Sequence, residues 1–427
     1  MKNTLYQVRK VYEEEGLSFL EEVRDEAKQL KPGRTGAMEG SGYYSELQYK
    51  RVKSRTAQPM YHFHICSESL ERFEQDMAKL EVLLSERNLH LDRMGVSIDY
   101  AMALPKVLRQ GSRKGGALFF ETQEDWNKLA GPKSIQLHLG DHMIGSPASY
   151  ENAKAALKAG ITTMGNFSQF FGWDYPEFTD VEARTKETLK AIALMAEKHE
   201  EAGTLLHSNL DDGYGAAADD LGILIGFALL EKYIAEDLLG AKIAHSYGDM
   251  FFSPMKRLVF LSALKMVHGD QIAGSMIFTN KLGRNKSDEK LNTAHLAECL
   301  LFDMTGQYLF KTGHAVTVMA DCGLVPGVAP EEIVTLLGYA HELEAYVPQT
   351  AELMDLEKIE GLASEIVERG KWFFEAVISY LDGFIDIENP YAVTLALKRI
   401  GIRKLAEMFK SRDVRGVIGA DYGLYIH

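Results

Sequence analysis

Cysteine is scarce in this sequence, and basic residues are outnumbered by acidic ones. Only three of the 427 residues are cysteines, Cys66, Cys299 and Cys322, and no Cys-x-x-Cys pair occurs. This spacing argues against a disulfide framework and against a thiolate zinc site. The 47 lysines and arginines face 61 aspartates and glutamates, giving a net charge of −14. Nucleic acids and anionic membrane surfaces are therefore not expected as partners.

Long apolar runs are also missing. No stretch of 18 or more apolar residues is present, and the first residues, MKNTLYQVRKVYEEEG, lack the apolar core of a signal peptide. We expect a soluble, cytoplasmic protein that does not cross a membrane. With 46% hydrophobic and 25% charged residues, the composition is that of a globular protein with ample material for a core.

The stretch from Ser134 to Glu177 has the pattern of one complete parallel α/β unit. Its apolar run Ser134–Leu139 is followed by a polar loop, an amphipathic helix over Ala148–Ala159 and a second apolar run at Ile161–Met164. Two strands that flank a helix in this order require a parallel crossover. The polar residues at the strand ends are where we expect the chemistry.

The same unit recurs along most of the chain. Apolar runs with polar ends predict eight strands, at Met60–Cys66, Met94–Asp99, Ser134–Leu139, Ile161–Gly165, Thr204–His207, Ala241–Tyr247, Ala273–Asn280 and Ala315–Asp321. Helical patterns alternate with them, at Ser67–Arg87, Leu104–Gln110 with Gln123–Leu129, Ala148–Ala159, Asp180–Glu201, Ala216–Leu239, Pro254–His268, Asp288–Phe310 and Pro330–Tyr346. We predict an α/β protein with a (β/α)8 TIM barrel. A doubly wound open sheet is the alternative, because order along the chain does not prove closure.

The barrel is predicted to span residues 59–346 and to carry an appendage at each end. Residues 1–58 comprise a charged amphipathic helix over Thr4–Leu30 and a segment whose apolar residues show no clear helical or strand periodicity. We expect this N-terminal helical arm to lie over the barrel mouth or over a partner subunit. Residues 347–427 are predicted as a mainly helical C-terminal extension, ending in a small strand or hairpin.

Barrel enzymes place their working residues at the carboxyl ends of the strands. In the first predicted strand, Tyr61-His62-Phe63-His64, both histidines lie on one face, because strand side chains alternate with a period of two. Imidazoles titrate near physiological pH and can act as donors or acids. We predict a catalytic site in which histidines bind the substrate while carboxylates and an amide orient it, composed of His62, His64, Asp99, His138, His142, Asn209 and Asp321.

A metal centre is the alternative interpretation of the same strand ends. One set of side chains resembles, position by position, the ligands of metal-dependent amidohydrolase barrels: His62, His64, His207, His245 and Asp321. Such a set suits Zn²⁺ or a similar divalent ion, whose bound water becomes a nucleophile near neutral pH. The fourth strand, ITTMGN, has no lysine to serve as a bridging ligand. We therefore favour histidines hydrogen-bonded in a polar pocket without a metal.

Segments at the strand ends follow one another in an order typical of one family. The segments are YHFHICSESLERFEQDMAKLEVLLSERN, GVSIDY, IQLHLGDHMIGSPAS, AGITTMGNFSQFFGWDYPEF, KIAHSYGDM, IFTNKLGRNKSDEKLNTAH and VTVMADCGLVPGVAPEE. In order and spacing, residues 61–339 resemble the large catalytic subunit of glutamate mutase (methylaspartate mutase), a TIM-barrel isomerase that uses adenosylcobalamin. The resemblance implies a partner, a separate small cobalamin-binding subunit.

The same resemblance implies where the cofactor would lie. Adenosylcobalamin would cover the barrel mouth and generate a radical, while the barrel holds the substrate and excludes water and oxygen. The residues that would face the corrin belong to the fourth strand end and the loop after it: Asn166, Phe167, Phe171, Tyr175 and Pro176.

Departures from the family pattern concern the substrate. The family grips the carboxylates of glutamate with arginines near the ends of the first three strands, where this chain has His64 or its neighbour, the Tyr100–Pro105 segment and His138. Imidazoles do not replace bidentate arginines. In the family, a glutamate on the fourth strand receives the amino group of the substrate; the matching position in this chain is at or near Gly165. The family also has lysines on the eighth strand, but the matching Ala320–Gly327 region contains no lysine. The expected substrate is therefore a small polar molecule other than glutamate.

Three functions follow from these patterns. A mutase-like isomerase is preferred, a metal-dependent hydrolase comes second, and a non-catalytic subunit with an inactive pocket comes third. The many polar residues at the predicted strand ends argue against the third. We also expect the chain to form a homo-oligomer.

Overall fold

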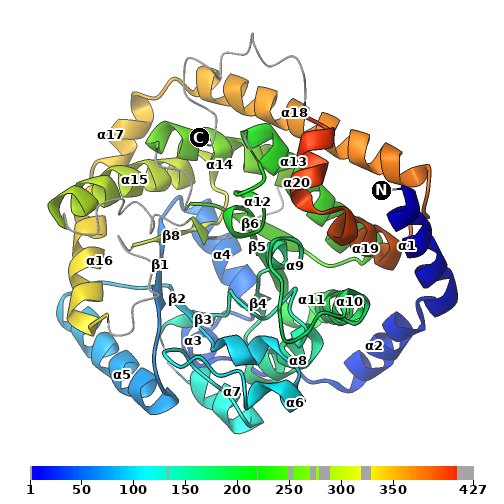
Figure 1. Cartoon of the computed structure of the whole chain (residues 1–427). Helices are drawn as coiled ribbons and strands as arrows, with labels where there is room; N and C mark the ends of the chain where they lie inside the picture. Colours follow the sequence, from blue (N-terminus) through cyan, green and yellow to red (C-terminus); the bar gives the residue numbers. More distant parts are fainter. Residues whose placement is uncertain are drawn as a thin grey trace.

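A computed structural model shows a mixed α/β protein in which helices surround centrally placed strands (Figure 1). The structure describes residues 2–131, 134–218, 220–248, 253–269, 276–277, 289–318 and 328–410. Asp321, the Ala320–Gly327 region and the predicted C-terminal strand or hairpin lie outside the described residues. Within them, no helix has both the length and the apolar character that a membrane crossing demands.

The described strands pair in parallel and form two sheets. They are β1 Met60–Ile65, β2 Arg93–Val96, β3 Gln136–His138, β4 Thr163–Met164, β5 Leu205–Asn209, β6 Ile243–Ser246, β7 Met276–Ile277 and β8 Ala315–Thr317. The first sheet has the order β3-β2-β1-β8-β7, and the second has the order β4-β5-β6. A parallel bridge from Leu139 to Met164 connects the ends of β3 and β4. Each strand lies within or overlaps a predicted apolar run, so the predicted strands are confirmed.

Helices separate consecutive strands, as the alternating pattern predicts. Before β1 lie α1 Lys2–Glu15, α2 Ser18–Gln29, α3 Gly36–Ser41 and α4 Glu46–Arg55. Between the strands lie α5 Leu70–Glu86, the 3₁₀ helix η1 Tyr100–Ala103, α6 Lys106–Arg109, α7 Gln123–Leu129, α8 Ser149–Ala159, α9 Ser168–Gly172, α10 Val181–Glu197, α11 His199–Ala202, α12 Leu210–Tyr214, α13 Leu221–Lys232, the π-helix η2 Tyr233–Leu238, α14 Pro254–His268 and α15 Glu289–Phe310. After β8 follow α16 Pro330–Glu344, α17 Val347–Glu352, α18 Leu356–Asp382, α19 Pro390–Ile400 and α20 Ile402–Met408.

Local chemistry sets many of these helix ends. Ser69, Asp220 and Asp355 precede α5, α13 and α18, and each side chain accepts a hydrogen bond from a backbone N–H of the first turn. Gly160 ends α8 in the left-handed region at φ +94°, where its missing side chain also lets the backbone of Arg34 approach.

The N-terminal arm differs from its prediction in two ways. The single helix expected over Thr4–Leu30 is wrong, because the chain turns at Gly16 with φ +64° and forms α1 and α2. Helix α4 packs Leu47 against Leu205, the first residue of β5, and against Ala244 of β6. This helix therefore covers the amino-terminal ends of the strands, opposite to the expected mouth.

The C-terminal helices pack on the outside of the strand and helix core. Helix α18 runs along α13 and α14, and α19 contacts α1 and α10 (Figure 1). Close approach of α18 to α13 depends on glycines: a side chain at Gly226 would meet the ring of Phe373. The predicted helical character of this extension is confirmed as far as residue 410.

Candidate functional site

Two histidines of β1 lie over a glycine of β2. His62 and His64 share one face of their strand, and Gly95 stands opposite His64 in the parallel register. A Cβ atom at Gly95 would lie 2.4 Å from His64 Nδ1 and 2.8 Å from His62 Nε2. The absent side chain at Gly95 therefore makes room for both rings, and the prediction that they share a face is confirmed.

The row of imidazoles continues from the first sheet into the second. Ring centroids of His64 and His62 are 6.4 Å apart, those of His62 and His138 6.1 Å apart, and those of His138 and His207 4.8 Å apart. His138 belongs to β3 and His207 to β5. We call these four residues the histidine row. It brings together three predicted catalytic residues and His207, which was predicted only as a metal ligand.

Burial favours the uncharged form of the imidazoles in the histidine row. His62, His138 and His207 are at most 2% exposed. Burial, followed by the positive charge of Arg93, lowers the pKa of each of these three imidazoles well below its usual value. At neutral pH each ring therefore offers one N–H donor and one nitrogen acceptor.

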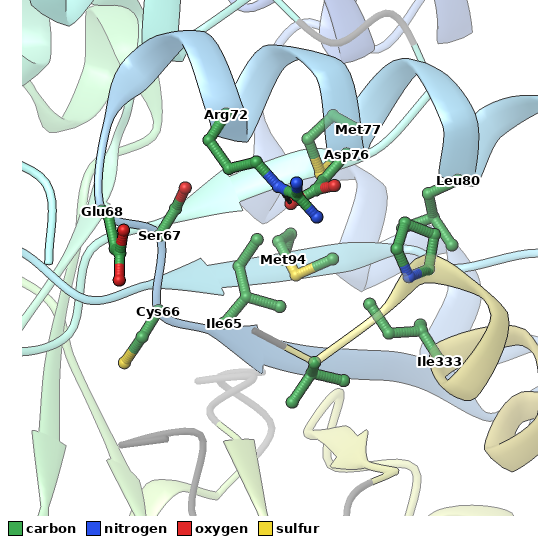
Figure 2. Close-up of a pocket in the computed structure, with 12 residues that line it drawn as sticks. Ile65, Cys66, Ser67, Glu68, Arg72, Asp76, Met77, Leu80, Met94 and Ile333 are labelled. Carbon is green, nitrogen blue, oxygen red and sulfur yellow. Dashed lines mark hydrogen bonds and ion pairs between the residues drawn. The ribbon is translucent and has the colours of Figure 1, made fainter. Parts of the chain in front are cut away.

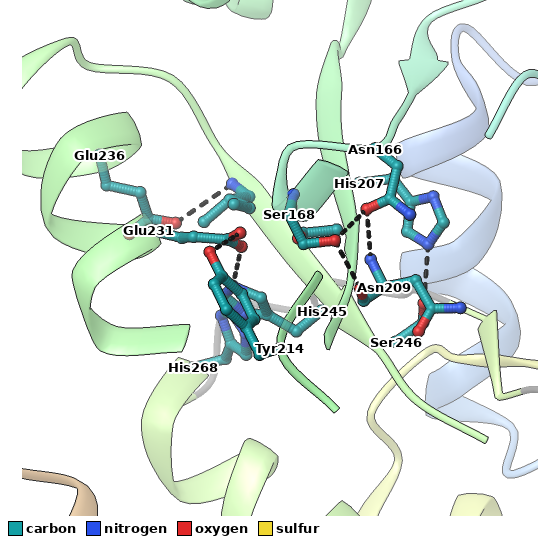
Figure 3. A network of polar contacts seen from close by, with 12 residues as sticks. Asn166, Ser168, His207, Asn209, Tyr214, Glu231, Glu236, His245, Ser246 and His268 are labelled. Atoms are coloured by element: carbon teal, nitrogen blue, oxygen red, sulfur yellow. Dashed lines mark hydrogen bonds and ion pairs between the residues drawn. The ribbon is translucent and has the colours of Figure 1, made fainter. Parts of the chain in front are cut away.

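Only part of this hydrogen-bonding capacity is used within the protein. His207 Nε2 lies 2.8 Å from Ser246 Oγ (Figure 3), and His64 Nε2 lies 2.8 Å from Ser97 Oγ. Both nitrogens of His138 and Nδ1 of His207 are buried, with no hydrogen-bond partner in the described part of the chain. Such atoms are rare in folded proteins and mark a place where a polar ligand or water would bind.

A charged cluster lies next to the histidine row at the amino-terminal ends of the strands. Glu46 and Lys50 reach it from α4, and Arg93 from the first position of β2. Arg93 Nε is 2.8 Å and Lys50 Nζ 3.3 Å from Glu46 Oε1. All three side chains are at most 3% exposed. We call these three residues the charged floor; none of them was among the predicted site residues.

Asp99 and Asn209 serve the local backbone. The carboxylate of Asp99 accepts hydrogen bonds from the backbone N–H groups of Ala101, Lys114 and Gly115. The amide oxygen of Asn209 accepts from the backbone of Asp211 and caps α12. Their observed contacts therefore shape the loops after β2 and β5, and neither is brought onto an imidazole of the row.

His142 lies in an aromatic cluster beyond β3. Its ring centroid is 5.9 Å from that of Tyr100 and 5.6 Å from that of Trp173, and its Nδ1 is 3.4 Å from Tyr175 Oη. Its backbone adopts φ +62°. The described ring contacts of His142 are with these aromatic residues, and the charge of Asp141 acts on both His142 and His64 of the row.

The residues predicted to face a corrin are mostly inside the protein. Phe167, Phe171 and Tyr175 are at most 7% exposed. Asn166 donates its amide N–H to Asp212 and accepts from Ser168 and from the backbone of Asn209. Pro176 is the exposed member. These side chains do not present an aromatic surface on which a corrin could lie.

Of the alternative metal ligands, His62, His64 and His207 belong to the histidine row, His245 does not, and Asp321 lies outside the described residues. His245 faces the helices, where its Nε2 is 3.1 Å from Glu231 Oε2 and its Nδ1 is 2.9 Å from His268 Nε2 (Figure 3). His207, on the neighbouring strand, faces Ser246 instead. Among the described residues, no group of three His, Cys, Asp or Glu side chains is placed to hold a metal ion. Side-chain alternation within each strand could not show from the sequence that His207 and His245 point to opposite sides of the sheet, because this depends on how the two strands are aligned.

A separate cavity of about 290 Å³ lies between β1, β2, α5 and α16 (Figure 2). Its apolar wall includes Met77, Met94 and Ile333, and its polar side includes Arg72 and Asp76. These two charges pair with each other at 2.8 Å. The residues that line the cavity do not include the histidine row, so we do not assign it to the site.

No protein-family model matches this chain, and a search of curated proteins finds no match. The resemblance to glutamate mutase thus stays a prediction, and the function is argued from the geometry of the site.

Proposed function

We propose that the eight parallel strands form a closed (β/α)8 barrel with the histidine row inside it. Several observations support closure. Neighbouring strands follow the chain order within both sheets, the Leu139 to Met164 bridge joins β3 to β4, and β6 contacts β7. The helices lie around the strands (Figure 1). The ring contact between His138 and His207 fits one shared interior.

The chain, in this proposal, is an enzyme that binds a small polar molecule at the histidine row. The observation that carries the proposal is the set of unpartnered nitrogens on His138 and His207. A buried polar group without a hydrogen bond costs about 1–3 kcal/mol. Hydroxyl, carbonyl or amino groups of a substrate would satisfy these atoms in a site from which water is excluded.

Neutral imidazoles determine what the site can do chemically. An uncharged ring can donate a hydrogen bond to a carbonyl or hydroxyl oxygen and polarise it without releasing a proton. Ser246 and Ser97 contact one nitrogen of His207 and His64, respectively, and thereby orient these rings. The row would position a substrate and stabilise developing charge on its oxygen atoms.

For the reaction we propose the isomerase class, as the catalytic subunit of a carbon-skeleton mutase acting on a substrate other than glutamate. This step rests on the family resemblance alone, as does the separate cobalamin-binding subunit. The homo-oligomer and the cytoplasmic location are proposals carried over from the sequence. Adenosylcobalamin would supply radical chemistry. Because Phe167, Phe171 and Tyr175 are buried, they do not fit the corrin-facing role, and we assign no step to the cofactor.

Ligand binding tests the proposed site. Thermal unfolding and calorimetry at pH 7.5 would use a panel of amino acids, hydroxy acids and 2-oxo acids together with their amides. At least one compound should bind, and His138→Phe and His207→Phe should each weaken it at least about tenfold. His295→Gln, at a half-exposed histidine of α15, should bind as the wild type does. The site is wrong if no compound binds or if both phenylalanine variants bind normally.

Two further measurements separate the reaction classes. Purified protein mixed with adenosylcobalamin and candidate small subunits should give a cobalamin spectrum on the complex; its absence argues against a mutase. Metal analysis tests the hydrolase. One or two divalent ions per chain, lost in a His62→Ala/His64→Ala double variant, would favour metal-dependent hydrolysis instead.

A further inference from the structure

Cys66 extends the face of β1 that carries two members of the histidine row. It directly follows the strand and stands two residues beyond His64, so the two side chains point to the same side. The thiol is half-buried, and Figure 2 shows its sulfur pointing away from the apolar wall of the neighbouring cavity. Cys66 therefore faces the row, at the carboxyl-terminal end of β1.

A hydrogen-bonded chain joins this thiol to an imidazole of the row. Cys66 Sγ donates to Ser97 Oγ at 3.1 Å, and Ser97 Oγ lies 2.8 Å from His64 Nε2. A hydroxyl group can accept one hydrogen bond while it donates another, so the chain can carry the thiol proton to His64. Burial lowers the pKa of His64, and the charge of Asp141 acts in the opposite direction. Asp141 would therefore stabilise the imidazolium that receives the proton.

Glycines follow β3 and β4 at the level of Ser97. The pairing of β2 with β3, continued by two residues, places Gly140 beside Ser97, and the bridge between the ends of β3 and β4 places Gly165 beside Gly140. A Cβ atom at Gly140 would lie 3.4 Å from His138 Nε2, and one at Gly165 would lie 2.7 Å from His207 Nδ1. Both nitrogens therefore point toward the level of the strand ends, where the thiol and Ser97 lie.

These two nitrogens can bind an oxygen atom. They belong to side chains that are at most 2% exposed, and neither has a hydrogen-bond partner in the part of the chain that the structure describes. A neutral imidazole N–H in a buried site can donate to an oxygen atom on which negative charge develops. His138 and His207 thus add oxygen-binding groups to a thiol and a proton acceptor.

We infer that Cys66 is the nucleophile of an acyl-transfer step, in which it takes an acyl group from a thioester or an activated ester. The acyl oxygen would accept hydrogen bonds from His138 and His207, so this inference rests on the proposed function of the row.

The step balances within this set of groups. The bond from Cys66 Sγ to the acyl carbon forms, and the bond from that carbon to the leaving atom breaks, with its electron pair remaining on the leaving atom. The thiol proton passes through Ser97 to His64 and from His64 to the leaving group. Water, an amine or a second thiol then takes the acyl group and regenerates the thiol of Cys66.

Small activated acyl donors test this inference on the full chain. p-Nitrophenyl acetate and S-phenyl thioacetate should each release their leaving group, measured by absorbance, and add one acetyl group, measured by intact mass. Peptide mapping should place the acetyl group on Cys66, and Cys66→Ala should lose it. Cys299→Ser, at a buried cysteine of α15, is the matched control and should be acetylated as the wild type is. No acetyl group on Cys66 would overturn the inference.

The serine between the thiol and the imidazole is tested by its pH profile. Ser97→Ala interrupts the hydrogen-bonded chain and should slow acetylation at least about tenfold at neutral pH. The dependence of the rate on pH should also change, because hydroxide then replaces His64 as the proton acceptor. Ser97→Thr keeps the hydroxyl group and should restore the wild-type profile. Identical profiles in the wild type and Ser97→Ala would overturn the proton path.

His138→Phe separates oxygen binding from the reactivity of the thiol. Alkylation of Cys66 by iodoacetamide places no negative charge on a carbonyl oxygen, so it should proceed at the wild-type rate in this variant. Acetylation should slow at least about tenfold. Equal slowing of both reactions would indicate a structural role for His138 and overturn the inference. Circular dichroism would verify that each variant folds.

The outcomes separate this inference from the proposed function. If compounds of the ligand panel bind and lose affinity in His138→Phe, but Cys66 is not acetylated, the polar site stands and the acyl-transfer inference fails. If no panel compound binds and Cys66 is acetylated equally fast in the wild type and in His138→Phe, the row binds no ligand oxygen, and both proposals fail.

Discussion

The imidazoles of His138 and His207 lie 4.8 Å apart, centroid to centroid, although β4 separates the strands that carry them. The contact is possible because Gly165, directly after β4, has no side chain. A Cβ atom there would lie 2.7 Å from His207 Nδ1 and 2.9 Å from the carbonyl oxygen of Gly140. Gly165 therefore holds open the space in which the two rings meet.

Gly165→Ala should disturb this contact. The added methyl group meets backbone as well as the ring, so we expect the free energy of unfolding to fall by about 1–3 kcal/mol. Gly361→Ala is the control, since a Cβ atom on that part of α18 meets nothing within 4 Å. It should gain about 0.5–1 kcal/mol from helix propensity. Urea unfolding of both variants measures the difference, and equal stabilities would contradict the close approach at Gly165.

His138→Phe should weaken ligand binding without lowering the stability of the fold. Phenylalanine fills a similar volume without polar atoms, so the variant should be as stable as the wild type or more stable, by up to about 1–3 kcal/mol. His314→Phe is the control. His314 is also buried, but both of its ring nitrogens have partners: Nδ1 lies 2.7 Å from Thr312 Oγ1, and Nε2 lies 2.9 Å from the carbonyl oxygen of His245. Losing these partners should cost about 1–3 kcal/mol. Denaturant unfolding of both variants checks the contrast, and a strongly destabilised His138→Phe would indicate a structural role.

Acid should destabilise the protein through its buried histidines. Burial lowers the pKa values of His62, His138, His207 and His268 in the folded state, and lowers that of His314 to about 3. Below about pH 6.5 the unfolded chain binds more protons than the folded one. The free energy of unfolding should therefore fall as pH decreases, by at most about 1.4 kcal/mol per pH unit for each histidine.

Urea unfolding between pH 5 and pH 7 measures how the free energy of unfolding depends on pH. Carboxylates ordinarily titrate below this range, so the change reports on the histidines. His138→Phe should reduce the slope, because one proton-binding site of the unfolded chain is removed. A stability that stays constant or rises toward pH 5 would show that these imidazoles are not held neutral by burial.

Lys398 should hold the loop after β4 in place. From α19, its Nζ donates to the backbone carbonyls of Phe171 and Trp173 at 3.2 and 2.9 Å and to the Asp174 carboxylate at 2.9 Å. Lys398→Met should speed amide hydrogen exchange in residues 169–174 and cost about 1.5–3 kcal/mol. Lys404→Met removes an exposed lysine of α20, 3.8 Å from Glu407, and should cost less than about 1 kcal/mol. Identical exchange in both variants would argue against the anchoring role.

Much of the site around β1 was predictable from the sequence. Period-two alternation placed His62 and His64 on one face, and their common contact with Gly95 confirms it. Helix α4 also has a local sequence signal, although no helix was predicted there. Ser45 is followed three residues later by Gln48, a typical helix start, and its side chain accepts from the Gln48 backbone. That signal would locate the helix but not the burial of Glu46 and Lys50.

The order and the type of the elements were determined by the sequence itself, because apolar periodicity, caps and glycines act over a few residues. Which strand-end side chains meet was decided only by the tertiary structure. His207 and His245 have the same residue type and similar positions, yet one faces Ser246 and the other faces Glu231 and His268. Strand register and packing between distant segments set these directions. For the same reason, Glu46 and Lys50 reach Arg93 beside the histidines only once α4 covers the ends of the strands.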